Sequence, residues 1–309
     1  MTDVAIVIVT WNVCTLVMDA IRTLRADLAT TPLTTTIYVV DSASQDNTVE
    51  TIRNQFPDVH LIALEENVGF VKANNIAMRH IGFDRPDFTG ELPKAVYLLN
   101  PDTLMPIGST QILYDALMRQ TDVGLVGARL AYGDDSFQHS AFRFPDLKQL
   151  WVEFFPSRGR WINGEFNGRY PQTAYEGTQP FDVDFVLGAT MLLKREAIQQ
   201  TGLFDEALFM YCEEIDWAKR IWNAKWRVQC VPTAKVIHLG GKSSEQAPPQ
   251  TIKRLWQSRL YLFQKYYSKP KLLLAQWMIA FGMTLKMRGV AKNTPLYDAY
   301  ASVRQQALN

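Results

Sequence analysis

A carboxylate and an imidazole each lie at the end of an apolar segment in this sequence. Asp102 lies in "LLNPDT", directly after the apolar run "AVY", and His238 ends the apolar run "VIH" before "LGG". Carboxylate oxygen and neutral imidazole are suitable ligands for Mg²⁺ or Mn²⁺, which commonly take one or two protein carboxylates together with substrate phosphates. Both residues can also have a purely structural role. The motif "NPDT" is typical of a turn, and a lone histidine is more often structural than a metal ligand.

A cluster of acids in "YCEEIDWAKR" indicates a second chemical function. Glu213, Glu214 and Asp216 fall in a segment that predicts a helix from about residue 213, on which Asp216 and Arg220 form a favourable i,i+4 pair. Acids at a helix N-terminus also complement the helix dipole. Bulky apolar residues flank this cluster, however, and carboxyl groups buried among such residues have the raised pKa values of general bases.

Two further polar motifs follow apolar runs. Asp41 precedes "SASQDNT", where it could cap a helix or accept hydrogen bonds from a base or ribose. The motif "ENVGFVKANN" contains Asn67, Gly69 and the adjacent Asn74 and Asn75. It lacks the spacing of dinucleotide and phosphate-loop motifs. The two asparagines are poor helix formers, which suggests a role, although they could also be exposed or bond back to their own helix.

These residues need a scaffold, and the first hundred positions predict one. Four apolar runs alternate with segments of helical character, which indicates a mostly parallel sheet covered on both faces. Ligands bind such sheets at the carboxyl ends of the strands, where these polar residues lie. The expected strands are 4–10, 36–41, 60–67 and 95–100, and the expected helices are 14–29, 43–55 and 70–81.

The rest of the chain has a different texture. Residues 131–182 are rich in aromatic residues, Gly and Pro, which predicts long loops with local structure. A strand pair or a strand followed by a helix is expected over 183–198, and one or two strands over 227–241. From about Thr251 the tail is predicted to be helical and amphipathic in places.

Composition excludes some classes of function. The net charge of +1 argues against nucleic acid as the main partner. Residues 250–309 are basic, with ten Lys and Arg and the single acid Asp298. Three widely spaced cysteines and an N-terminus unlike a signal peptide predict a cytoplasmic protein. The most apolar stretch, 272–285, is too short to cross a bilayer but could lie on one.

Taken together and in order, these motifs resemble the family 2 glycosyltransferases with the GT-A fold, in particular the rhamnosyltransferase-like branch of bacterial polysaccharide assembly. The resemblance runs from about residue 3 to 245 and is carried by "VAIVIVTWN", "IYVVDSASQDNT", "NVGFVKANN", "YLLNPDT", "VLGATMLLKREAIQQTGLFDEALFMYCEEIDWAKR" and "VIHLGGKSS". It implies a catalytic domain over 1–245, with a nucleotide-binding half at 1–103 and an acceptor-binding and catalytic half at 104–245. A basic helical extension would occupy 246–309.

The resemblance also implies roles for individual residues. Glu214 falls where the family commonly has its catalytic Asp, with Glu213 as the alternative base. Asp102 retains only the last acid of the family's DxD motif, as a ligand of Mg²⁺ or Mn²⁺ together with His238. The residues implied in nucleotide-sugar binding are Thr10, Trp11, Asp41, Asn67, Asn74, Asn100 and Asp102. Those implied near the donor sugar or the acceptor are Gly188, Ala189, Thr190, Trp217 and Arg220.

The implied activity is an inverting sugar transfer to a glycan or a polyprenyl-linked acceptor of the cell envelope. The leading donor is dTDP-rhamnose, with UDP-sugars as the alternative. A nucleotidyltransferase would need a Gly-rich, basic phosphate loop after the first strand, and "TWNVCTL" is not one. A catalytically silent binding protein remains an alternative because the first acid of DxD is absent. The basic tail could contact anionic lipid as a peripheral anchor, or pack on the body or on a second subunit.

Overall fold

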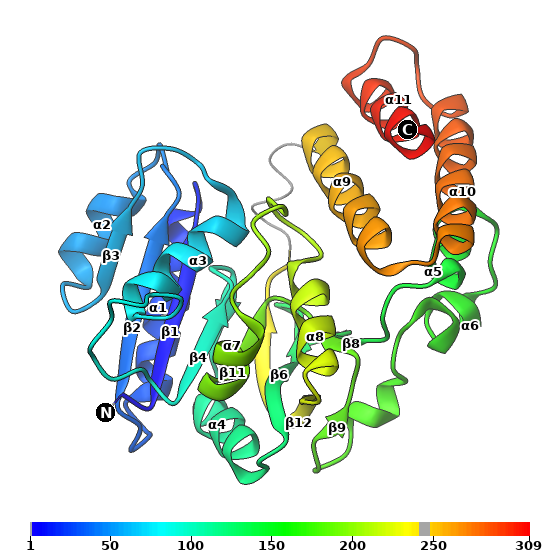
Figure 1. Ribbon diagram of the computed structural model, residues 1–309. Helices are drawn as coiled ribbons and strands as arrows, with labels where there is room; N and C mark the ends of the chain where they lie inside the picture. Colours follow the sequence, from blue (N-terminus) through cyan, green and yellow to red (C-terminus); the bar gives the residue numbers. More distant parts are fainter. Residues whose placement is uncertain (1, 241–247) are drawn as a thin grey trace.

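The computed structural model describes residues 2–240 and 248–309, which contain a mixed, mostly parallel sheet of ten strands flanked by helices (Figure 1). The strand order is β3-β2-β1-β4-β11-β6-β12-β5, with β7 beside β6 and β9 beside β12. The strands of this sheet are β1 (Val4–Thr10), β2 (Thr35–Asp41), β3 (His60–Ala63), β4 (Ala95–Leu99), β5 (Thr103–Leu104), β6 (Val123–Ala131), β7 (Phe137–Gln138), β9 (Phe181–Asp182), β11 (Thr190–Lys194) and β12 (Arg227–His238). A separate pair is formed by β8 (Ala141–Phe142) and β10 (Phe185–Val186).

The α-helices of the described residues are α1 (Cys14–Leu28), α2 (Thr48–Gln55), α3 (Gly69–Ile81), α4 (Ser109–Arg119), α5 (Leu147–Phe154), α6 (Gly159–Ile162), α7 (Arg195–Thr201), α8 (Glu213–Asn223), α9 (Pro248–Tyr266), α10 (Lys269–Arg288) and α11 (Pro295–Leu308). Helices α1, α2 and α4 cover one face of the sheet and α3, α7 and α8 the other, as the sequence predicted, and α9, α10 and α11 pack with α5 beside it. Residues 131–182 form short strands and helical turns joined by loops, which confirms the texture predicted for them. None of the described helices is both long and apolar enough to cross a membrane.

The alternating side chains of β1 explain why its run is apolar throughout. Val4, Ile6 and Ile8 belong to a core cluster that includes buried residues of α1, α2 and α4. The intervening side chains of β1 belong to a second cluster on the other face, which includes buried residues of α3, α7 and α8. Because helices cover both faces, every position of the strand is buried.

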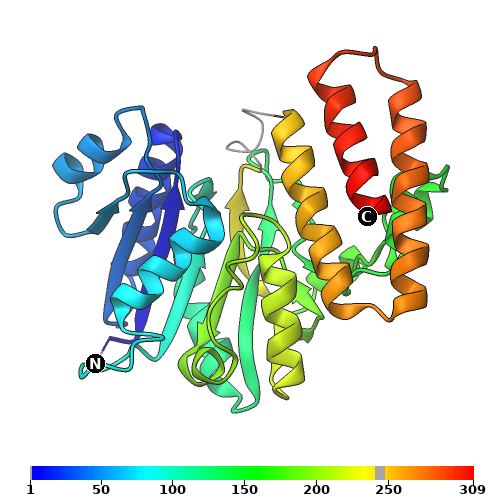
Figure 2. The same cartoon turned by 45° about the horizontal axis from the view of Figure 1, so that its top comes forward.

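A third hydrophobic cluster joins the C-terminal helices to α5 (Figure 2). Leu150 of α5 packs with Trp256 of α9 and Met278 of α10 in this cluster. The contact between α10 and α5 is close at Gly282, where an added Cβ would lie 2.2 Å from the ring of Phe154. The predicted helical tail is therefore confirmed. The predicted domain boundary at 245/246 and the end of "VIHLGGKSS" lie outside the described residues.

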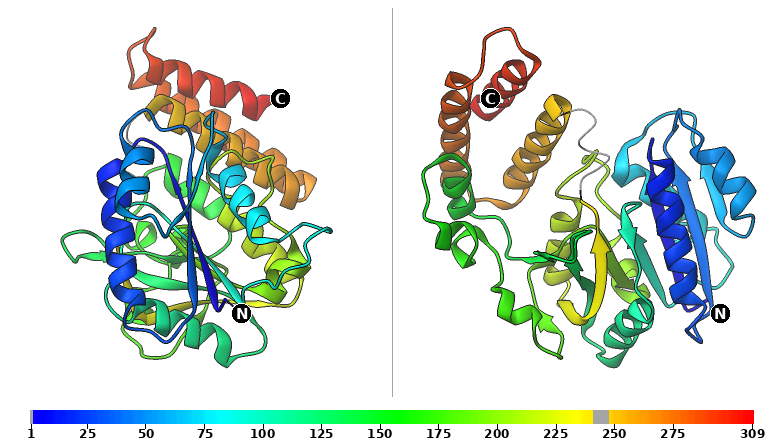
Figure 3. Two further views of the ribbon diagram at one scale, coloured as in Figure 1. Left: turned by 90° about the vertical axis from the view of Figure 1, so that its left-hand side faces the viewer. Right: turned by 180° about the vertical axis from the view of Figure 1, so that it is seen from behind.

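An ion-pair network fastens α9 to α8, two helices that lie next to each other in Figure 3. The Asp216 side chain is fully buried, and its carboxylate accepts hydrogen bonds from Arg220 Nε at 2.9 Å and Tyr266 Oη at 2.8 Å. Lys265 Nζ lies 2.7 Å from the same carboxylate. The predicted pair between Asp216 and Arg220 thus forms, and it belongs to a larger contact that fixes the tail against the body of the protein.

Candidate functional site

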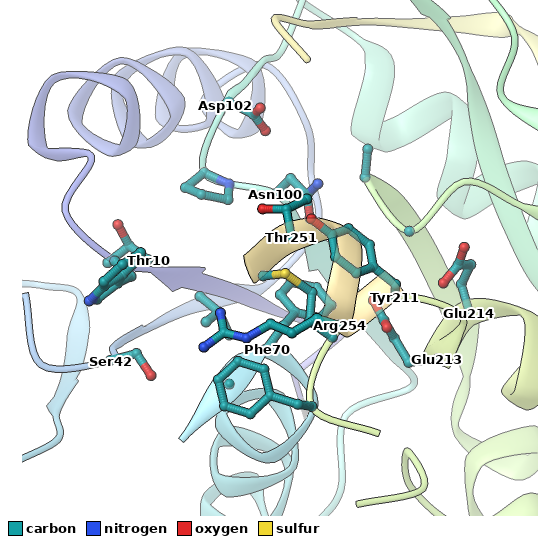
Figure 4. A pocket seen from close by; sticks show the side chains of 18 of the residues that line it. Thr10, Ser42, Phe70, Asn100, Asp102, Tyr211, Glu213, Glu214, Thr251 and Arg254 are labelled. Carbon is teal, nitrogen blue, oxygen red and sulfur yellow. The ribbon is translucent and has the colours of Figure 1, made fainter. Parts of the chain in front are cut away.

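A cavity of about 390 Å³ lies at the carboxyl ends of β1, β2 and β4 (Figure 4). Its walls also include the start of α3, the turn between β10 and β11, the start of α8, the end of β12 and the first turns of α9. Most of the residues singled out in the sequence line it, namely Thr10, Trp11, Asn67, Asn100, Asp102, Gly188, Ala189, Glu213, Glu214 and His238. Segments from distant parts of the chain therefore meet at one cavity, where parallel sheets bind ligands.

Buried polar atoms without a hydrogen-bond partner gather at the ends of β1 and β2. Thr10 Oγ1, Asp41 Oδ2 and Ser42 Oγ have no partner among the residues that the structure describes. Thr10 and Ser42 line the cavity. Asp41, the last residue of β2, is buried and does not line it, and its Oδ1 accepts a hydrogen bond from Ser44 N at 2.9 Å. Native proteins rarely leave such atoms unsatisfied, so the two hydroxyl groups that line the cavity, Thr10 and Ser42, favour the binding of a polar ligand.

The loops that carry these atoms are held in place by each other. Asn12 N donates to Ser44 Oγ at 2.8 Å, and Asn12 Oδ1 accepts from Gln45 N at 2.7 Å. Both loops also contain a non-glycine residue in the left-handed region, Asn12 at φ 52° and Ala43 at φ 60°. Strained backbone of this kind clusters at ligand sites, where the surrounding structure maintains it.

Asp102 and His238 lie side by side at the edge of the cavity. His238 Nε2 is 3.3 Å from Asp102 Oδ1, and both side chains are largely buried. The opposite ring nitrogen of His238, Nδ1, lies 3.2 Å from Gln138 Oε1. With Nδ1–H donating to this amide oxygen, Nε2 presents its lone pair beside the carboxylate.

This pair fits a divalent cation that completes its coordination with ligand oxygens. One oxygen donor and one imidazole nitrogen suit Mg²⁺ or Mn²⁺, and such ions tolerate few protein ligands when a diphosphate supplies others. Within residues 2–240 and 248–309, no group of three or more His, Cys, Asp or Glu side chains could hold a metal by itself. The cation would therefore depend on a bound substrate for part of its coordination.

Glu213 and Glu214 form a carboxyl pair in the first turn of α8. Burial, followed by the charge of Glu214, raises the pKa of Glu213 well above its usual range. Burial also raises the pKa of Glu214 to about 7. The Glu213 Oε2 atom has no hydrogen-bond partner among the described residues, and Tyr211 and Cys212, which lead into the helix, are both in the left-handed region. Glu214 lines a second cavity as well, whereas Glu213 lines only the first.

Several residues of the first cavity were not identified from the sequence. Arg254, with Gln250 and Thr251, enters it from the first turns of α9, and the Arg254 guanidinium lies 4.2 Å above the centre of the Phe209 ring. Figure 4 shows this guanidinium pointing into the cavity. In the sequence, Arg254 is one of ten basic residues of the tail, and nothing local distinguishes it.

Phe209 itself depends on a glycine. Gly69 has φ +85°, and an added Cβ would lie 2.6 Å from the carbonyl oxygen of Phe209. This position at the start of α3 therefore needs glycine for two reasons, its conformation and its close approach to the segment before α8. The Asn67 side chain fixes the same turn by accepting a hydrogen bond from Gly69 N at 3.0 Å.

Five residues expected at the site do not line the cavity, namely Asp41, Asn74, Thr190, Trp217 and Arg220. Thr190 is buried, and its Oγ1 accepts a hydrogen bond from Ala128 N at 3.2 Å. Asn74 is buried and donates from Nδ2 to Phe70 O at 2.9 Å, so it bonds back to its own helix. Trp217 is fully buried, and its Nε1 donates to Thr201 Oγ1 at 2.9 Å. Arg220 bonds to Asp216 and to the Leu203 carbonyl. Asn74, Trp217 and Arg220 are thus used in packing or in internal hydrogen bonds in this structure. Ligand contact at all five positions stays a prediction.

Comparison with known proteins points to one family. The profile of Glycosyl transferase family 2 matches residues 5–202. N-acetylglucosaminyl-diphospho-decaprenol L-rhamnosyltransferase of Mycobacterium tuberculosis is 31% identical over 219 residues, which is 69% of each chain. Rhamnosyltransferase WbbL of Escherichia coli is 27% identical over 176 residues, covering 55% of this chain and 60% of the relative.

Two solved structures share the fold. Mannosyltransferase PcManGT from Pyrobaculum calidifontis, in complex with GDP-Man and Mn²⁺, aligns with 99% of this chain and 81% of its own at a TM-score of 0.55 and 18% identity. GalNAc-T7 with UDP, GalNAc and Mn²⁺ aligns with 76% of this chain at a TM-score of 0.54 and 16% identity. This chain covers only 42% of the GalNAc-T7 chain. At such identities the likeness concerns the fold alone, which is that of the GT-A glycosyltransferases.

The raised pKa of the carboxyl pair predicts how stability changes with pH. An acid whose pKa is higher in the folded chain stabilises the fold fully below its unfolded value near 4.5, and this contribution is lost as pH rises through the folded value, about 7 for Glu214. Glu213→Gln replaces the acid with a neutral group of similar shape. We expect the variant to melt a few degrees higher than wild type at pH 8 and at the same temperature at pH 5.

Thermal unfolding at the two pH values, followed by circular dichroism, measures this difference. Glu176→Gln is the matched control, because Glu176 is exposed and its variant should melt with wild type at both pH values. If Glu213→Gln melts at or below the wild-type temperature at pH 8, the ionised Glu213 does not destabilise the fold and its pKa is not raised by burial.

Proposed function

Because the chain belongs to Glycosyl transferase family 2, we propose that it transfers a sugar from a nucleotide donor to a hydroxyl group of a glycan or lipid-linked acceptor, with inversion at the anomeric carbon. The observation that carries this proposal is the meeting of three chemical groups at one cavity. These groups are the unpartnered polar atoms after β1 and β2, the pair Asp102 and His238, and the carboxyl group of Glu214. In the proposed reaction the first group would bind the nucleotide, the second would bind the diphosphate through a cation, and the third would remove the proton of the acceptor hydroxyl.

The donor would lie with its base and ribose at the ends of β1 and β2. Thr10, Trp11 and Ser42 would contact it there, and the unpartnered Asp41 Oδ2 lies at the end of β2, next to Ser42 in the chain. Asn67 and Asn100 border the same space. The leading donor is dTDP-rhamnose because both relatives described above are named as rhamnosyltransferases, with UDP-sugars as the alternative.

The diphosphate would lie between two sources of positive charge. Asp102 and His238 would hold Mg²⁺ or Mn²⁺, which when bound stabilises the negative charge that develops on the leaving nucleoside diphosphate. Arg254 enters the cavity from α9 and would bind phosphate oxygens directly. This role makes the C-terminal extension, 246–309 in the proposed division, part of a site otherwise built from the halves 1–103 and 104–245.

Glu214 is the better candidate for the catalytic base. It faces both cavities, so it can contact an acceptor that approaches from the side opposite the donor. In the proposed step the acceptor oxygen bonds to the anomeric carbon and its proton moves to Glu214. The sugar–phosphate bond breaks, and its electron pair stays on the diphosphate. Glu213 lines only the first of these two cavities, and the raised pKa of Glu214 comes from its burial.

Replacing the proposed base tests the function. We expect Glu214→Gln to lower the rate of nucleoside diphosphate release in the presence of acceptor by about 100-fold or more, the usual contribution of a general base. Glu213→Gln is the matched control and should lose less than about tenfold. The wild-type rate should rise as pH increases through about 7, where Glu214 loses its proton. Equal release by wild type and Glu214→Gln would favour a catalytically silent binding protein.

Nucleotide binding can be tested without an acceptor. We expect one of dTDP, UDP or GDP with Mn²⁺ to raise the melting temperature, because a ligand at about 100 times its dissociation constant stabilises the fold by about 2.7 kcal/mol. Asp102→Asn and His238→Asn should lose the increment that Mn²⁺ adds. Asp87→Asn, which alters an exposed pair with Arg85, should retain it. A Mn²⁺ increment that is unchanged in both site variants would remove the proposed cation site.

The exposed face of α10 fits an anionic lipid surface. Leu273, Leu274, Trp277 and Phe281 lie at helical spacing and are all exposed, with Leu273 at 67% and Trp277 at 59%. Exposed basic residues lie at both ends of the helix, including Lys269 and Arg288. Apolar and aromatic side chains between basic residues are typical of a helix that lies at the bilayer surface. The mycobacterial relative is named for a decaprenol-linked substrate, which agrees with a membrane location for the acceptor.

Vesicle binding tests this contact. We expect wild type to sediment with phosphatidylglycerol vesicles and to remain in solution with phosphatidylcholine, and the double variant Leu273→Ser/Trp277→Ser to lose binding because its apolar face is removed. Ile107→Ser changes an equally exposed residue near α4 and should bind as wild type does. If the double variant binds vesicles normally but loses a concentration-dependent dimer, the face is a homodimer contact and the membrane proposal is wrong.

A further inference from the structure

A second cavity of about 300 Å³ adjoins the first at Glu214. Leu187, Tyr211 and Glu214 line both cavities, so these three side chains form the partition between them. Helix α9 also contributes to both, with Arg254 in the first cavity and Leu255 and Arg259 in the second. A base that removes a proton from an attacking hydroxyl group must contact the acceptor. Because the donor is proposed to occupy the first cavity, the second cavity offers the acceptor a separate route to Glu214.

The walls of the second cavity combine apolar and cationic side chains. Leu150, Leu255 and Phe263 provide apolar surface, and three arginines, Arg143, Arg169 and Arg259, line the same space. The apolar side chains suit the ring and chain of an amphiphile, whereas guanidinium groups favour phosphate.

Two of the three acids that line this cavity, Asp146 and Glu153, are paired with basic side chains, and the third is Glu214. Asp146 is 2.7 Å from Lys271 Nζ, and Glu153 is 3.3 Å from Lys286 Nζ while it also pairs with Arg259 at 3.1 Å. Arg143 stacks over the Tyr170 ring at 4.9 Å, and its nearest acid, Glu165, lies 3.7 Å away with its side chain 70% exposed. The Arg143 charge is therefore weakly compensated and available to an anionic ligand.

Helix α5 links the second cavity to the exposed apolar face of α10. Helix α5 contributes Leu150 to the cavity and Trp151 to the surface. The Trp151 ring lies 4.5 Å from that of Phe155, which stacks on Phe281 of α10 at 6.0 Å. Phe281 in turn stacks on Trp277 at 5.5 Å. A row of aromatic rings thus leads from the helix that walls the cavity to the face proposed to contact lipid.

We propose that the second cavity is the acceptor site and that it recognises a sugar joined through a diphosphate to an isoprenoid chain. The sugar hydroxyl would lie at Glu214, the diphosphate among Arg143, Arg169 and Arg259, and the chain along Leu255, Phe263 and the aromatic row. This assignment rests on the proposed glycosyl transfer. It adds the residues that bind the acceptor and the reason that an anionic, lipid-linked acceptor is preferred to a neutral glycan.

Farnesyl diphosphate is a suitable probe, because it carries the anionic group and the chain without requiring the correct sugar. Calorimetric titration in the presence of the nucleoside diphosphate that stabilises the protein most, with Mn²⁺, keeps the first cavity occupied. We expect saturable binding by wild type and binding weakened about tenfold or more in Arg143→Glu, which replaces a charge-assisted contact with a repulsion. Leu255→Trp should weaken binding similarly by filling the cavity.

Matched controls separate this site from general charge effects. Arg160→Glu makes the same charge change at an exposed position of α6 that does not line the second cavity, and it should bind as wild type does. Inorganic diphosphate should bind more weakly than farnesyl diphosphate; equal affinity would show that the site recognises the anion alone. Equal effects of Arg143→Glu and Arg160→Glu, no effect of Leu255→Trp, or no saturable binding by wild type would each overturn the assignment.

The outcome is distinguishable from failure of the proposed function. Nucleoside diphosphate binding without acceptor is measured at the first cavity, which neither Arg143 nor Leu255 lines. If wild type turns over a donor while the second-cavity variants bind farnesyl diphosphate normally, only the acceptor assignment is wrong. If no nucleoside diphosphate binds or is released, the glycosyltransferase proposal fails whatever the farnesyl diphosphate titration gives.

Discussion

The short pairing of β5 with β12 is the constraint on which the proposed cation site depends. Thr103 pairs with His238 in this ladder, and Leu239 N donates to the Asp102 carbonyl at 2.9 Å. On the other side of the same turn, Asn100 N donates to Ala189 O at 3.0 Å. These backbone bonds bring an aspartate and a histidine from distant segments to 3.3 Å and fix the turn that carries Asn100 against the sheet. Without them Asp102 would be only a turn residue.

The carboxyl pair depends on a different principle, the cost of burying charge. The chain enters α8 through two residues in the left-handed region and then places two acids side by side where water is largely excluded. Burial makes protons bind more tightly to both groups, and the charge of Glu214 adds to this effect at Glu213. This arrangement costs stability above neutral pH, and it is the condition under which a glutamate becomes basic enough to accept a proton from a hydroxyl.

The C-terminal helices connect these features to the surface. Asp216 holds Lys265 and Tyr266 of α9 against α8, so that Arg254 reaches the first cavity while Leu255 and Arg259 reach the second. Several basic residues of the tail therefore form ion pairs with acids of the preceding domain, among them Asp146, Glu153 and Asp205. The apolar side chains Leu273, Leu274 and Trp277 of α10 remain exposed to solvent.

The sequence by itself determined the fold class and the polar ends of the strands. The apolar run 4–10, the helix that begins at Glu213 and the polar residues after the strands are local patterns, so composition and spacing suffice to predict them. Tertiary structure decided which side chains meet. Arg254 reaches the cavity only because α9 packs on α8, and Trp217 and Arg220, which the sequence placed beside the ligand, are instead used in packing and in hydrogen bonds to carbonyl oxygens. The direction in which a helical side chain points is set by contacts with residues distant in sequence, and no local pattern carries that information.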